Sequence, residues 1–433
     1  MKLKEESFVV EGLNGERKLK GKIKVNGSKN GALPLLSSIF LFKGPVTFTN
    51  VPNIEDVKRM SELFKDLGVK VKKGKDSLTL DATLANKSNL TRELSKRLRA
   101  SIILLGPILG KMGKVQFPHP GGCVIGERPI DLFIDNFKKM GSSFEEKDGT
   151  HTITTKKEGL LGTEIVFKIQ SVTASETFLM AGILAKGKTV LKNVAIEPEV
   201  TELAHFLKAC GAKIDGIGTT TLEIEGGELL NSPLTSVPVI PDRIEAGSFL
   251  ILGALCGKNL IIENCEPKHL DVPIKILEEM GIDLEVGENS ITVKGLKKGF
   301  EKTRSTNVKT HEYPGFPTDI QAPMVVLLTQ SEGEGTVFET IFEGRLNYTD
   351  ELKRMGADIK MYDAHHVTIK GPTPLRGKDL QSPDIRAGLA FLIAATVAEG
   401  KSVIGNAYLI DRGYEKIEKR LKKIGVEIKR VSN

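Results

Sequence analysis

The stretch DIRAGLAFLIAATVAEG, residues 384–400, decides the fold, because five similar stretches precede it at regular spacing. It is apolar nearly all round, it is rich in small residues, and it ends in glycine. A helix of this composition is buried on all sides. The six copies occupy residues 31–44, 101–113, 175–187, 244–257, 319–333 and 384–400.

Each apolar helix opens a larger repeat. A short β-type run follows it, and a second, amphipathic helix then ends in another glycine. The second glycines lie 69 to 75 residues apart, at Gly68, Gly141, Gly211, Gly281, Gly356 and Gly425. Two short strands joined by a polar turn complete the unit. The pattern predicts six β-α-β-α-β-β repeats, whose period is longer than that of open solenoids.

The number of repeats predicts the domain organisation. A chain of 433 residues is too long for a single core, so we expect two α/β domains of three repeats, with buried helices inside and sheets outside. The proline-bearing segment 230–243 is the best crossing point between them. The sixth repeat lacks a closing strand pair, which the N-terminal segment would supply. We therefore expect a discontinuous domain of residues 1–28 and 239–433, and a second domain of residues 29–238.

The composition excludes several classes of protein. The chain is 40% hydrophobic and 27% charged, which is typical of a folded globular protein. The N-terminus lacks the apolar core of a signal peptide, and no apolar run reaches the roughly 18 residues needed to span a bilayer. The four cysteines have no paired spacing, so we expect no metal site, no disulfide and a cytoplasmic location.

The net charge of +7 admits nucleic acid as a partner. The lysines are nevertheless spread along helical faces, and aromatic residues make up only 5% of the chain without interleaving with basic ones. We expect instead a cleft that focuses cations on a small anionic substrate. No nucleic acid, membrane or obligate protein partner is expected.

Charged residues occupy equivalent helix starts in the repeats. The charged residues at the starts of the apolar helices are Lys29, Arg99, Arg243, Asp319 and Arg386, and the third repeat has Thr173 instead. The starts of the second helices include Arg128, Arg345 and Arg412. A helix start disfavours a cation by a few tenths to about 1 kcal/mol. An anion bound between these side chains and the free N–H groups would explain the placement. Alternatively, the arginines pair with the neighbouring acids Asp242, Asp384 and Asp411.

Three local motifs add candidate chemistry. The glycine-rich loop of residues 119–133 carries Cys123, whose thiolate Arg128 would favour, although Cys123 is alternatively an incidental small residue. Asp319 follows Thr318 at a helix start and is either an N-cap or a general base. Residues 27–30 form a phosphate-cradle type of turn without the spacing of nucleotide hydrolases.

Six motifs in order resemble the enolpyruvyl transferase family over nearly the whole chain. They are GSKNGALP, RASI, PGGCVIGERPIDL, PDRIEAGSF, FPTDIQA and DRGYE, at residues 27–34, 99–102, 120–132, 241–249, 316–322 and 411–415. The resemblance implies a two-domain inside-out α/β barrel whose active site lies in the cleft between the domains. It also implies transfer of the enolpyruvyl group of phosphoenolpyruvate to the 3′-hydroxyl of UDP-N-acetylglucosamine, the first committed step of peptidoglycan synthesis. The implied reaction is an addition–elimination through a tetrahedral intermediate, and it needs no metal or organic cofactor.

The resemblance implies a role for each site residue. Cys123 would protonate the enolpyruvyl methylene, Asp319 would deprotonate the sugar hydroxyl, and Lys29 would act on phosphoenolpyruvate. Contacts to phosphoenolpyruvate are implied for Lys29, Asn30, Arg128, Arg345, Arg386 and Arg412. Contacts to the UDP-sugar are implied for Arg99, Arg128, Pro129, Ile130, Asp131, Leu132, Ser171, Val172, Thr173, Asp319 and Ile341. Cys123 is also the family's target for alkylation by fosfomycin.

The chain departs from the family pattern at three positions. Phe133 stands where the family commonly has histidine, Thr173 replaces a usual glycine, and Ser28 replaces the commoner alanine. We expect altered packing on the nucleotide side and an intact reaction. Two alternatives stay open, namely the family's branch that acts on shikimate 3-phosphate and a basic repeat scaffold without enzymatic activity.

Overall fold

The computed structural model describes residues 6–118 and 130–432. Contacts divide these residues into two units. Unit 1 contains residues 6–26 and 241–432, and unit 2 contains residues 27–118 and 130–240. The domain limits expected after residues 28 and 238 stay a prediction. Within the described ranges, no helix is both long and apolar enough to cross a membrane.

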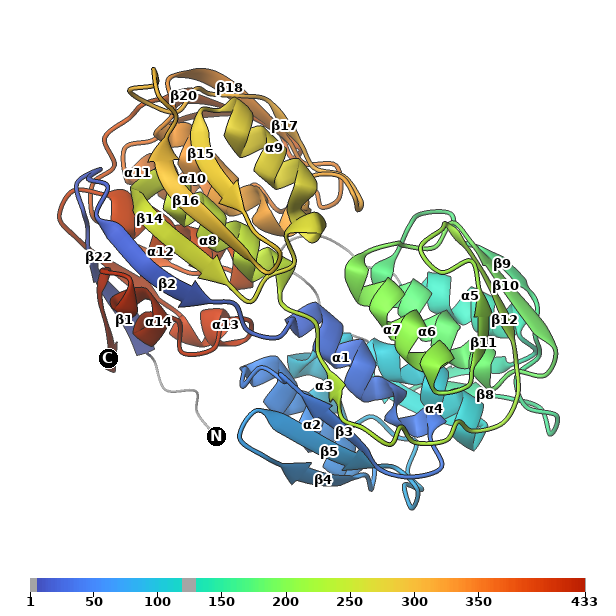
Figure 1. Cartoon of the computed structure of the whole chain (residues 1–433). Coiled ribbons are helices and arrows are strands. Elements are labelled where there is room, and N and C mark those ends of the chain that lie inside the picture. Colours follow the sequence, from blue (N-terminus) through green and yellow to red (C-terminus); the bar gives the residue numbers. More distant parts are fainter. Residues whose placement is uncertain (1–5, 119–129, 433) are drawn as a thin grey trace. The chain divides into compact units, whose positions relative to one another are not determined.

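Three apolar helices form the interior of each unit (Figure 1). Unit 1 has α8 (Arg243–Cys256), α10 (Gln321–Thr329) and α12 (Ile385–Val397), and unit 2 has α1 (Lys29–Ser37), α4 (Leu105–Met112) and α6 (Val172–Ile183). All 14 residues of α8 are buried, as its lack of a polar face requires. Small residues let these helices approach closely. A Cβ on Gly106 of α4 would lie 2.1 Å from the carbonyl oxygen of Thr177 in α6.

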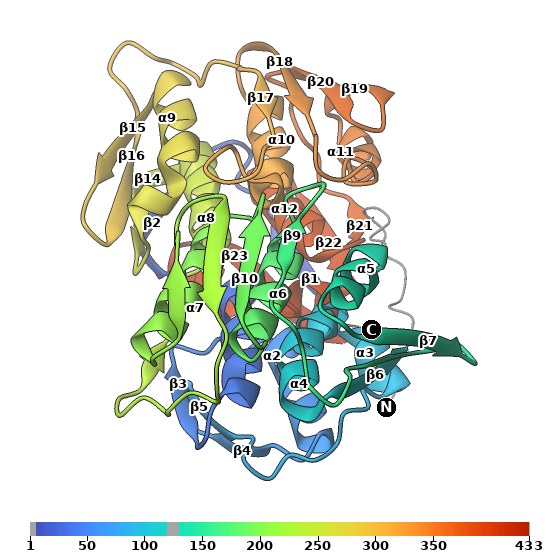
Figure 2. The ribbon, with the colours of Figure 1, turned by 90° about the vertical axis from the view of Figure 1, so that its right-hand side faces the viewer.

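The sheets of unit 1 each have four strands. Their orders are β21-β22-β1-β23, β15-β16-β14-β2 and β17-β18-β20-β19. The strands are β1 (Glu6–Glu11), β2 (Leu19–Lys24), β14 (Gly257–Glu263), β15 (Ile282–Val286), β16 (Ser290–Leu296), β17 (Val308–Lys309), β18 (Gly333–Phe338), β19 (Asp358–Asp363), β20 (His366–Gly371), β21 (Asp379–Gln381), β22 (Lys401–Gly405) and β23 (Glu427–Ser432). Figure 2 shows the third of these sheets beside α10.

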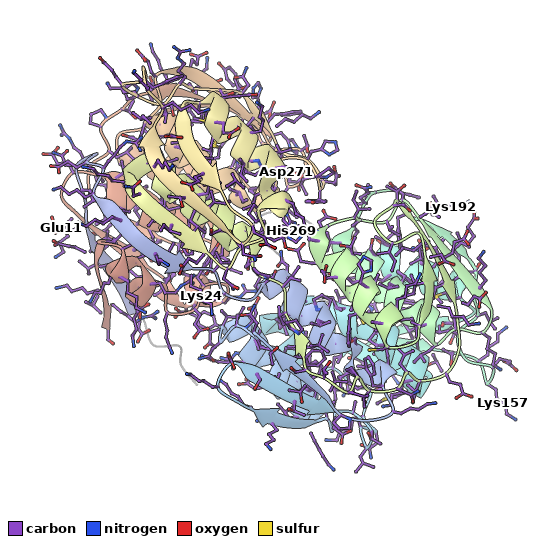
Figure 3. All side chains as sticks on the ribbon, viewed as in Figure 1. Glu11, Lys24, Lys157, Lys192, His269 and Asp271 are labelled. Carbon is purple, nitrogen blue, oxygen red and sulfur yellow. The ribbon has the colours of Figure 1, made fainter. Side chains whose placement is uncertain are left out.

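Within the described residues, unit 2 has two sheets of four strands and one of three, with orders β13-β3-β5-β4, β11-β12-β10-β9 and β6-β8-β7. The strands are β3 (Val46–Thr49), β4 (Lys70–Lys73), β5 (Ser77–Asp81), β6 (Lys114–Pro118), β7 (Ser143–Lys147), β8 (Thr150–Thr154), β9 (Glu164–Val166), β10 (Lys188–Lys192), β11 (Lys213–Asp215), β12 (Thr221–Glu225) and β13 (Val237–Pro238). One face of each sheet covers the helices and the other carries charge, as Glu11 on β1 and Lys192 on β10 illustrate (Figure 3).

The chain passes from one unit to the other directly after two strands, so each of these strands and the helix that follows it belong to different units. Strand β2 leads into α1 of unit 2 but pairs in parallel with β14 of unit 1. Strand β13 leads into α8 of unit 1 but pairs in parallel with β3 of unit 2. The N-terminal segment was expected to complete the sixth repeat as a whole, and this is wrong for its second half. Only β1 joins the sixth repeat, between β22 and β23, because β2 matches the fourth.

The second helix of each repeat ends just before the predicted glycine. These helices are α2 (Glu55–Asp66), α5 (Asp131–Lys139), α7 (Pro198–Ala209), α9 (Asp271–Glu279), α11 (Thr349–Arg354) and α14 (Ile417–Lys423). The six glycines that follow them all have φ between +87° and +110°. This left-handed conformation ends a helix at little cost only in glycine. The regular spacing of these glycines therefore reflects the backbone conformation that ends each second helix.

Candidate active site

Asp319 lies between two buried arginines in unit 1. It sits in the short helix η4 (Thr318–Ile320), which leads into α10. Its Oδ1 accepts a hydrogen bond from Arg345 Nη1 at 2.7 Å, and its Oδ2 accepts one from Arg386 Nη2 at 2.8 Å. The side chains of Arg345 and Arg386 are 7% and 6% exposed, so water screens these ion pairs weakly. Asp319 is not at an N-cap position, because it is the second residue of η4 and Ile320 is the N-cap of α10.

Arg386 is held at both ends of its guanidinium group. Its Nη1 donates to the hydroxyl oxygen of Tyr414 at 2.9 Å, while Nη2 binds Asp319. Burial opposes the charge of Arg386, but the carboxylate of Asp319 and the nearby Tyr414 raise its pKa well above the usual value. Burial likewise raises the pKa of Tyr414 to about 12, so this phenol stays neutral. Arg386 is therefore a fixed cation.

The acids of the ion-pair alternative have backbone or other side-chain partners as well, and the alternative stays a prediction. Asp384 caps α12, because its Oδ1 accepts from the backbone N–H groups of Arg386 and Ala387. Asp242 caps α8 in the same manner. Asp411 binds Arg430 of β23 at 2.6 and 2.8 Å. The acid that takes the side chain of Arg386 comes instead from another repeat.

Arg345 and Ile341 lie on one turn between β18 and α11. The Nη1 atom of Arg345 also donates to Thr318 Oγ1 at 3.1 Å, so one guanidinium contacts two successive residues of η4. Ile341 is half-buried, and its backbone N–H donates to the carboxylate of Glu339 at 2.9 Å. Arg412 is half-buried and follows the short helix α13 (Ala407–Asp411). Hydrogen bonds thus join Asp319 to Arg345 and Arg386, and Ile341 lies on the same turn as Arg345. Arg412, the fifth predicted site residue of unit 1, lies two residues before Tyr414, which binds Arg386.

Lys29 opens helix α1 in unit 2. Ser28 caps this helix, since its Oγ accepts from Gly31 N at 3.1 Å. The Nζ atom of Lys29 lies 3.7 Å from Oδ2 of Asp56 on α2, and the two side chains are 15% and 4% exposed. Asn30 is half-buried in the first turn. A cation therefore stands at the N-terminal end of a helix, which is the arrangement that suits an anion.

Two further helix starts of unit 2 carry the predicted nucleotide contacts. Ser171 caps α6 by accepting from Ala174 N at 3.3 Å, and Val172 and Thr173 are half-buried in its first turn. Arg99 begins the short helix η2 (Arg99–Leu104), which packs against both α1 and α6. Helix η2 thus contacts two other helices, α1 and α6, whose first residues are also predicted contacts.

The remaining predicted residues lie at or before α5. Ile130 is buried at the N-cap position of α5, Asp131 is exposed as its first residue, and Leu132 is half-buried. Phe133 packs on Phe178 of α6, with ring centroids 6.2 Å apart and planes 23° apart. An apolar contact therefore stands where the family pattern has a histidine. Cys123, Arg128 and Pro129 lie outside the described residues.

Sequence reasoning missed several residues around the site. Tyr414 lies within the DRGYE motif, so its position offered a signal. Glu339 offered none, because an acid after a strand is common. In unit 2, Glu176 of α6 is fully buried, and burial, followed by the nearby Glu199 and Glu197, raises its pKa well above the usual value. Among the residues that the structure describes, no three potential ligands gather as a metal site.

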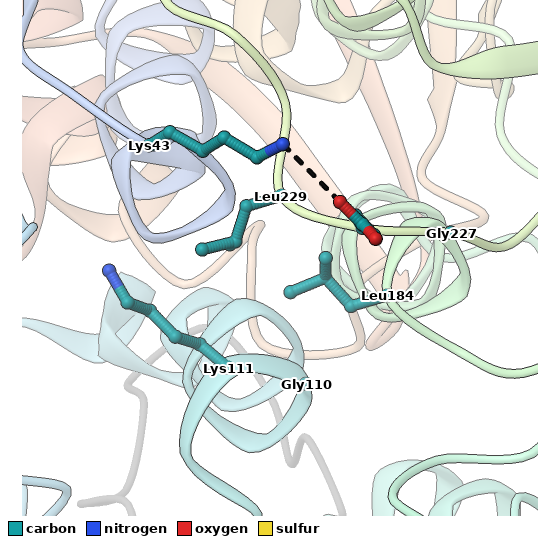
Figure 4. A pocket seen from close by; sticks show the side chains of 7 residues that line it. Lys43, Gly110, Lys111, Leu184, Gly227 and Leu229 are labelled. Carbon is teal, nitrogen blue, oxygen red and sulfur yellow. Dashed lines mark hydrogen bonds and ion pairs between the residues drawn. The ribbon is translucent and has the colours of Figure 1, made fainter.

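A pocket of about 350 Å³ in unit 2 is separate from these residues (Figure 4). It is lined by Lys43, Gly110, Lys111, Leu184, Gly227, Glu228 and Leu229. Gly110 and Leu184 lie at the C-terminal ends of α4 and α6, whereas the predicted contacts lie at helix starts. Lys43 pairs with Glu228 at 3.4 Å, and Lys111 donates to the carbonyl oxygen of Ala82. The cations here match the negative ends of helices and need no ligand.

Known proteins resemble the chain along its whole length. The EPSP synthase family, 3-phosphoshikimate 1-carboxyvinyltransferase, matches residues 13–421. The UDP-N-acetylglucosamine 1-carboxyvinyltransferase of Desulforapulum autotrophicum is 41% identical over 419 residues, which cover 97% of this chain and 99% of that protein. The protein of the same name from Koribacter versatilis is 42% identical over 423 residues, with coverages of 97% and 96%.

Solved structures show the fold. The enolpyruvyl transferase NikO from Streptomyces tendae has a TM-score of 0.88 at 24% identity, with full coverage of both chains. EPSP synthase from Acinetobacter baumannii has a TM-score of 0.72 at 20% identity, covering 99% of this chain and 100% of that one. The predicted fold class is thereby confirmed. The chain belongs to the enolpyruvyl transferase family and, within it, to the UDP-N-acetylglucosamine 1-carboxyvinyltransferases.

Proposed function

We propose that this transferase moves the enolpyruvyl group of phosphoenolpyruvate to the 3′-hydroxyl of UDP-N-acetylglucosamine and releases phosphate, as a step of peptidoglycan synthesis. The name shared by the relatives at 41% and 42% identity supports this acceptor. The observation that carries the chemistry is the position of Asp319 between Arg345 and Arg386. Two fixed guanidiniums that hold one carboxylate are suited to hold the carboxylate of a substrate.

The reaction assigns one task to each proposed residue. Asp319 takes the proton of the sugar hydroxyl as its oxygen bonds to C2 of phosphoenolpyruvate, while Cys123 delivers a proton to C3. The tetrahedral intermediate then loses a proton from C3 and expels phosphate, which restores the double bond. Arg345 and Arg386 hold the substrate carboxylate.

The other residues hold phosphate and nucleotide in this proposal. Fixed cations around a leaving phosphate lower the barrier because the charge is stabilised without rearrangement. The proposed phosphate contacts are Lys29, Asn30, Arg128 and Arg412. The proposed contacts to the UDP-sugar are Arg99, Arg128, Pro129, Ile130, Asp131, Leu132, Ser171, Val172, Thr173, Asp319 and Ile341.

A phosphate-release assay tests the function directly. The purified chain is mixed with phosphoenolpyruvate and either UDP-N-acetylglucosamine or shikimate 3-phosphate, in parallel. We expect phosphate release only in the mixture that contains the UDP-sugar, and a product heavier than the UDP-sugar by one enolpyruvyl group. Release with shikimate 3-phosphate alone would establish the family's other branch, whose name the matching family carries. Release with neither acceptor would contradict the proposal.

A further inference from the structure

We infer that Glu339 is a positioning residue for the active site, which ties the turn carrying Ile341 and Arg345 to the residue preceding Asp319. The inference rests on the proposed function, because it concerns how those residues are held for that reaction. Glu339 follows β18 and is completely buried. A buried carboxylate needs hydrogen-bond donors, so its three donors identify what it organises.

The two oxygens of Glu339 serve different segments. Oε1 accepts from the backbone N–H groups of Ile341 and Phe342, at 2.9 and 3.2 Å. Oε2 accepts from the hydroxyl of Thr318 at 2.8 Å. One carboxylate therefore closes the turn that precedes Arg345 and binds the first residue of η4.

The hydroxyl of Thr318 passes this constraint on to Arg345. Because it donates its single proton to Glu339, its oxygen is free to accept from Arg345 Nη1, at 3.1 Å. The same Nη1 atom binds Asp319 at 2.7 Å. A chain of hydrogen bonds thus runs from Glu339 through Thr318 to Arg345 and ends at the proposed base.

Glu339 is itself firmly anchored. Its backbone N–H donates to the carbonyl oxygen of His365 at 2.8 Å, and its own carbonyl oxygen lies 2.6 Å from His365 Nδ1. The next residue, Thr340, binds Thr310 through both its N–H group and its hydroxyl. The carboxylate therefore acts from a fixed support, which is what a positioning group requires.

The substitution Glu339→Gln separates the two connections. The amide oxygen keeps the bonds to the N–H groups of Ile341 and Phe342, so the turn stays closed. The amide nitrogen replaces Oε2 and donates to Thr318, so the hydroxyl loses its acceptor and Arg345 meets a competing donor. We expect kcat to fall about tenfold through misplaced reacting groups, with the KM for UDP-N-acetylglucosamine changed by less than about twofold.

Thr318→Val provides the second variant, because it removes the same hydroxyl while leaving Glu339 in place. We expect a similar loss of kcat. The double variant should be no slower than the slower single one, since both changes cut the same chain of bonds.

Thr303→Val is the matched control. Thr303 and Ser331 share a buried hydroxyl hydrogen bond of 2.9 Å in the same unit, and Ser331 lies beyond the C-terminal end of α10, whereas Thr318 precedes its N-terminal end. This control should lose thermal stability but keep kcat.

The measurements are phosphate release with both substrates varied and thermal unfolding of each variant. An unchanged kcat for Glu339→Gln, with only a lower unfolding temperature, would make Glu339 a structural residue and overturn the inference. If the kcat losses of the two single variants multiply in the double variant, then Glu339 does not act through Thr318. Absence of turnover by the unsubstituted enzyme would instead refute the proposed function, so the two failures are distinguishable.

Discussion

The two units share one topology but surround their helix starts with different charges. In unit 1, the acid Asp319 lies between Arg345 and Arg386 at 2.7 and 2.8 Å. In unit 2, the nearest distance between Lys29 and Asp56 is 3.7 Å, and Glu176 has other acids for neighbours. The repeat therefore determines where a helix begins. It does not determine which charges meet there, because those come from other repeats.

The difference has a chemical consequence. In unit 1 the substrate-facing groups are proposed to work as a set, since Asp319 shares hydrogen bonds with both arginines. In unit 2 the Nζ atom of Lys29 lies 3.7 Å from its acid, and its charge is proposed to act on a phosphate. We expect substitutions in the unit 1 network to be coupled and severe, and substitutions at the Lys29–Asp56 pair to be milder.

Asp319→Asn is the largest test of this comparison. It removes the proposed base and leaves two buried guanidiniums without their shared carboxylate. General acid–base groups contribute about 10²–10⁴-fold to rate, so we expect kcat to fall within that range. Because breaking a buried ion pair leaves uncompensated charge, unfolding free energy should also fall, by at most about 3–5 kcal/mol. Phosphate release and chemical denaturation measure the two effects.

Asp56→Asn is the counterpart in unit 2. It is the same chemical change at a carboxylate 4% exposed, 3.7 Å from Lys29. We expect kcat/KM to fall by less than about tenfold, since a longer ion pair contributes less to holding the cation. A loss of activity as large as that of Asp319→Asn would contradict the comparison, because the two ion pairs would then contribute equally.

The sequence predicted the framework well for a physical reason. Apolar helices have no face for solvent, and a glycine such as Gly356, with φ of +110°, is required by the backbone itself. These are local properties. The pairing of β2 with β14 of the fourth repeat was not predicted, because a short parallel strand does not encode its partner.

The candidate site was predictable only in part. Register placed Asp319 and Arg386 at helix starts, but their ion pair depends on the reach of side chains from different repeats. Glu339 and Tyr414 act through hydrogen bonds across 21 and 28 residues of sequence, which leave no local pattern.

The same reason explains why the sequence showed no aromatic residues interleaved with basic ones. The structure aligns Lys309, Phe338 and His366 across three neighbouring strands, although these residues are far apart in the sequence.

Alkylation of cysteine provides a test of intermediate size. Burial raises the pKa of Cys256 to about 12 and that of Cys265 to about 11, both in unit 1, and it also raises the pKa of Cys210 in unit 2. Thiolates are the reactive form, so these three thiols should resist an epoxide. We expect fosfomycin to add once, at Cys123. Intact mass and peptide mapping measure the adduct.

Cys123→Ser is the control for this test, and it should prevent the adduct and strongly impair turnover. An adduct that persists in this variant would show that a thiol with a raised pKa reacts, and would contradict the argument from burial. Full turnover by the variant would remove Cys123 from its proposed role as proton donor.

Glu176→Gln is expected to give the smallest effect. It tests whether the buried acid of unit 2 stays protonated, in contrast to the ion-paired Asp319 of unit 1. The pKa of Glu176 is raised in the folded state by burial and by Glu199 and Glu197. As pH rises above the ordinary value of 4.5, the unfolded chain releases this proton while the folded chain retains it. The unfolded state then binds fewer protons, so stability falls with rising pH, by at most about 1.4 kcal/mol per pH unit. The amide does not titrate, so Glu176→Gln should be more stable than the unsubstituted chain at about pH 8 and similar at about pH 4.

Glu225→Gln is the matched control, because Glu225 is an exposed acid of the same unit. Its pKa is lowered by a hydrogen bond with Lys213, so it is ionised in both states above about pH 5. Its substitution should leave the slope of stability against pH unchanged from about pH 5 to 8. Urea denaturation across this range measures both variants. If Glu176→Gln keeps the slope of the unsubstituted chain, then Glu176 is ionised in the folded protein, and burial beside Glu199 and Glu197 does not hold its proton.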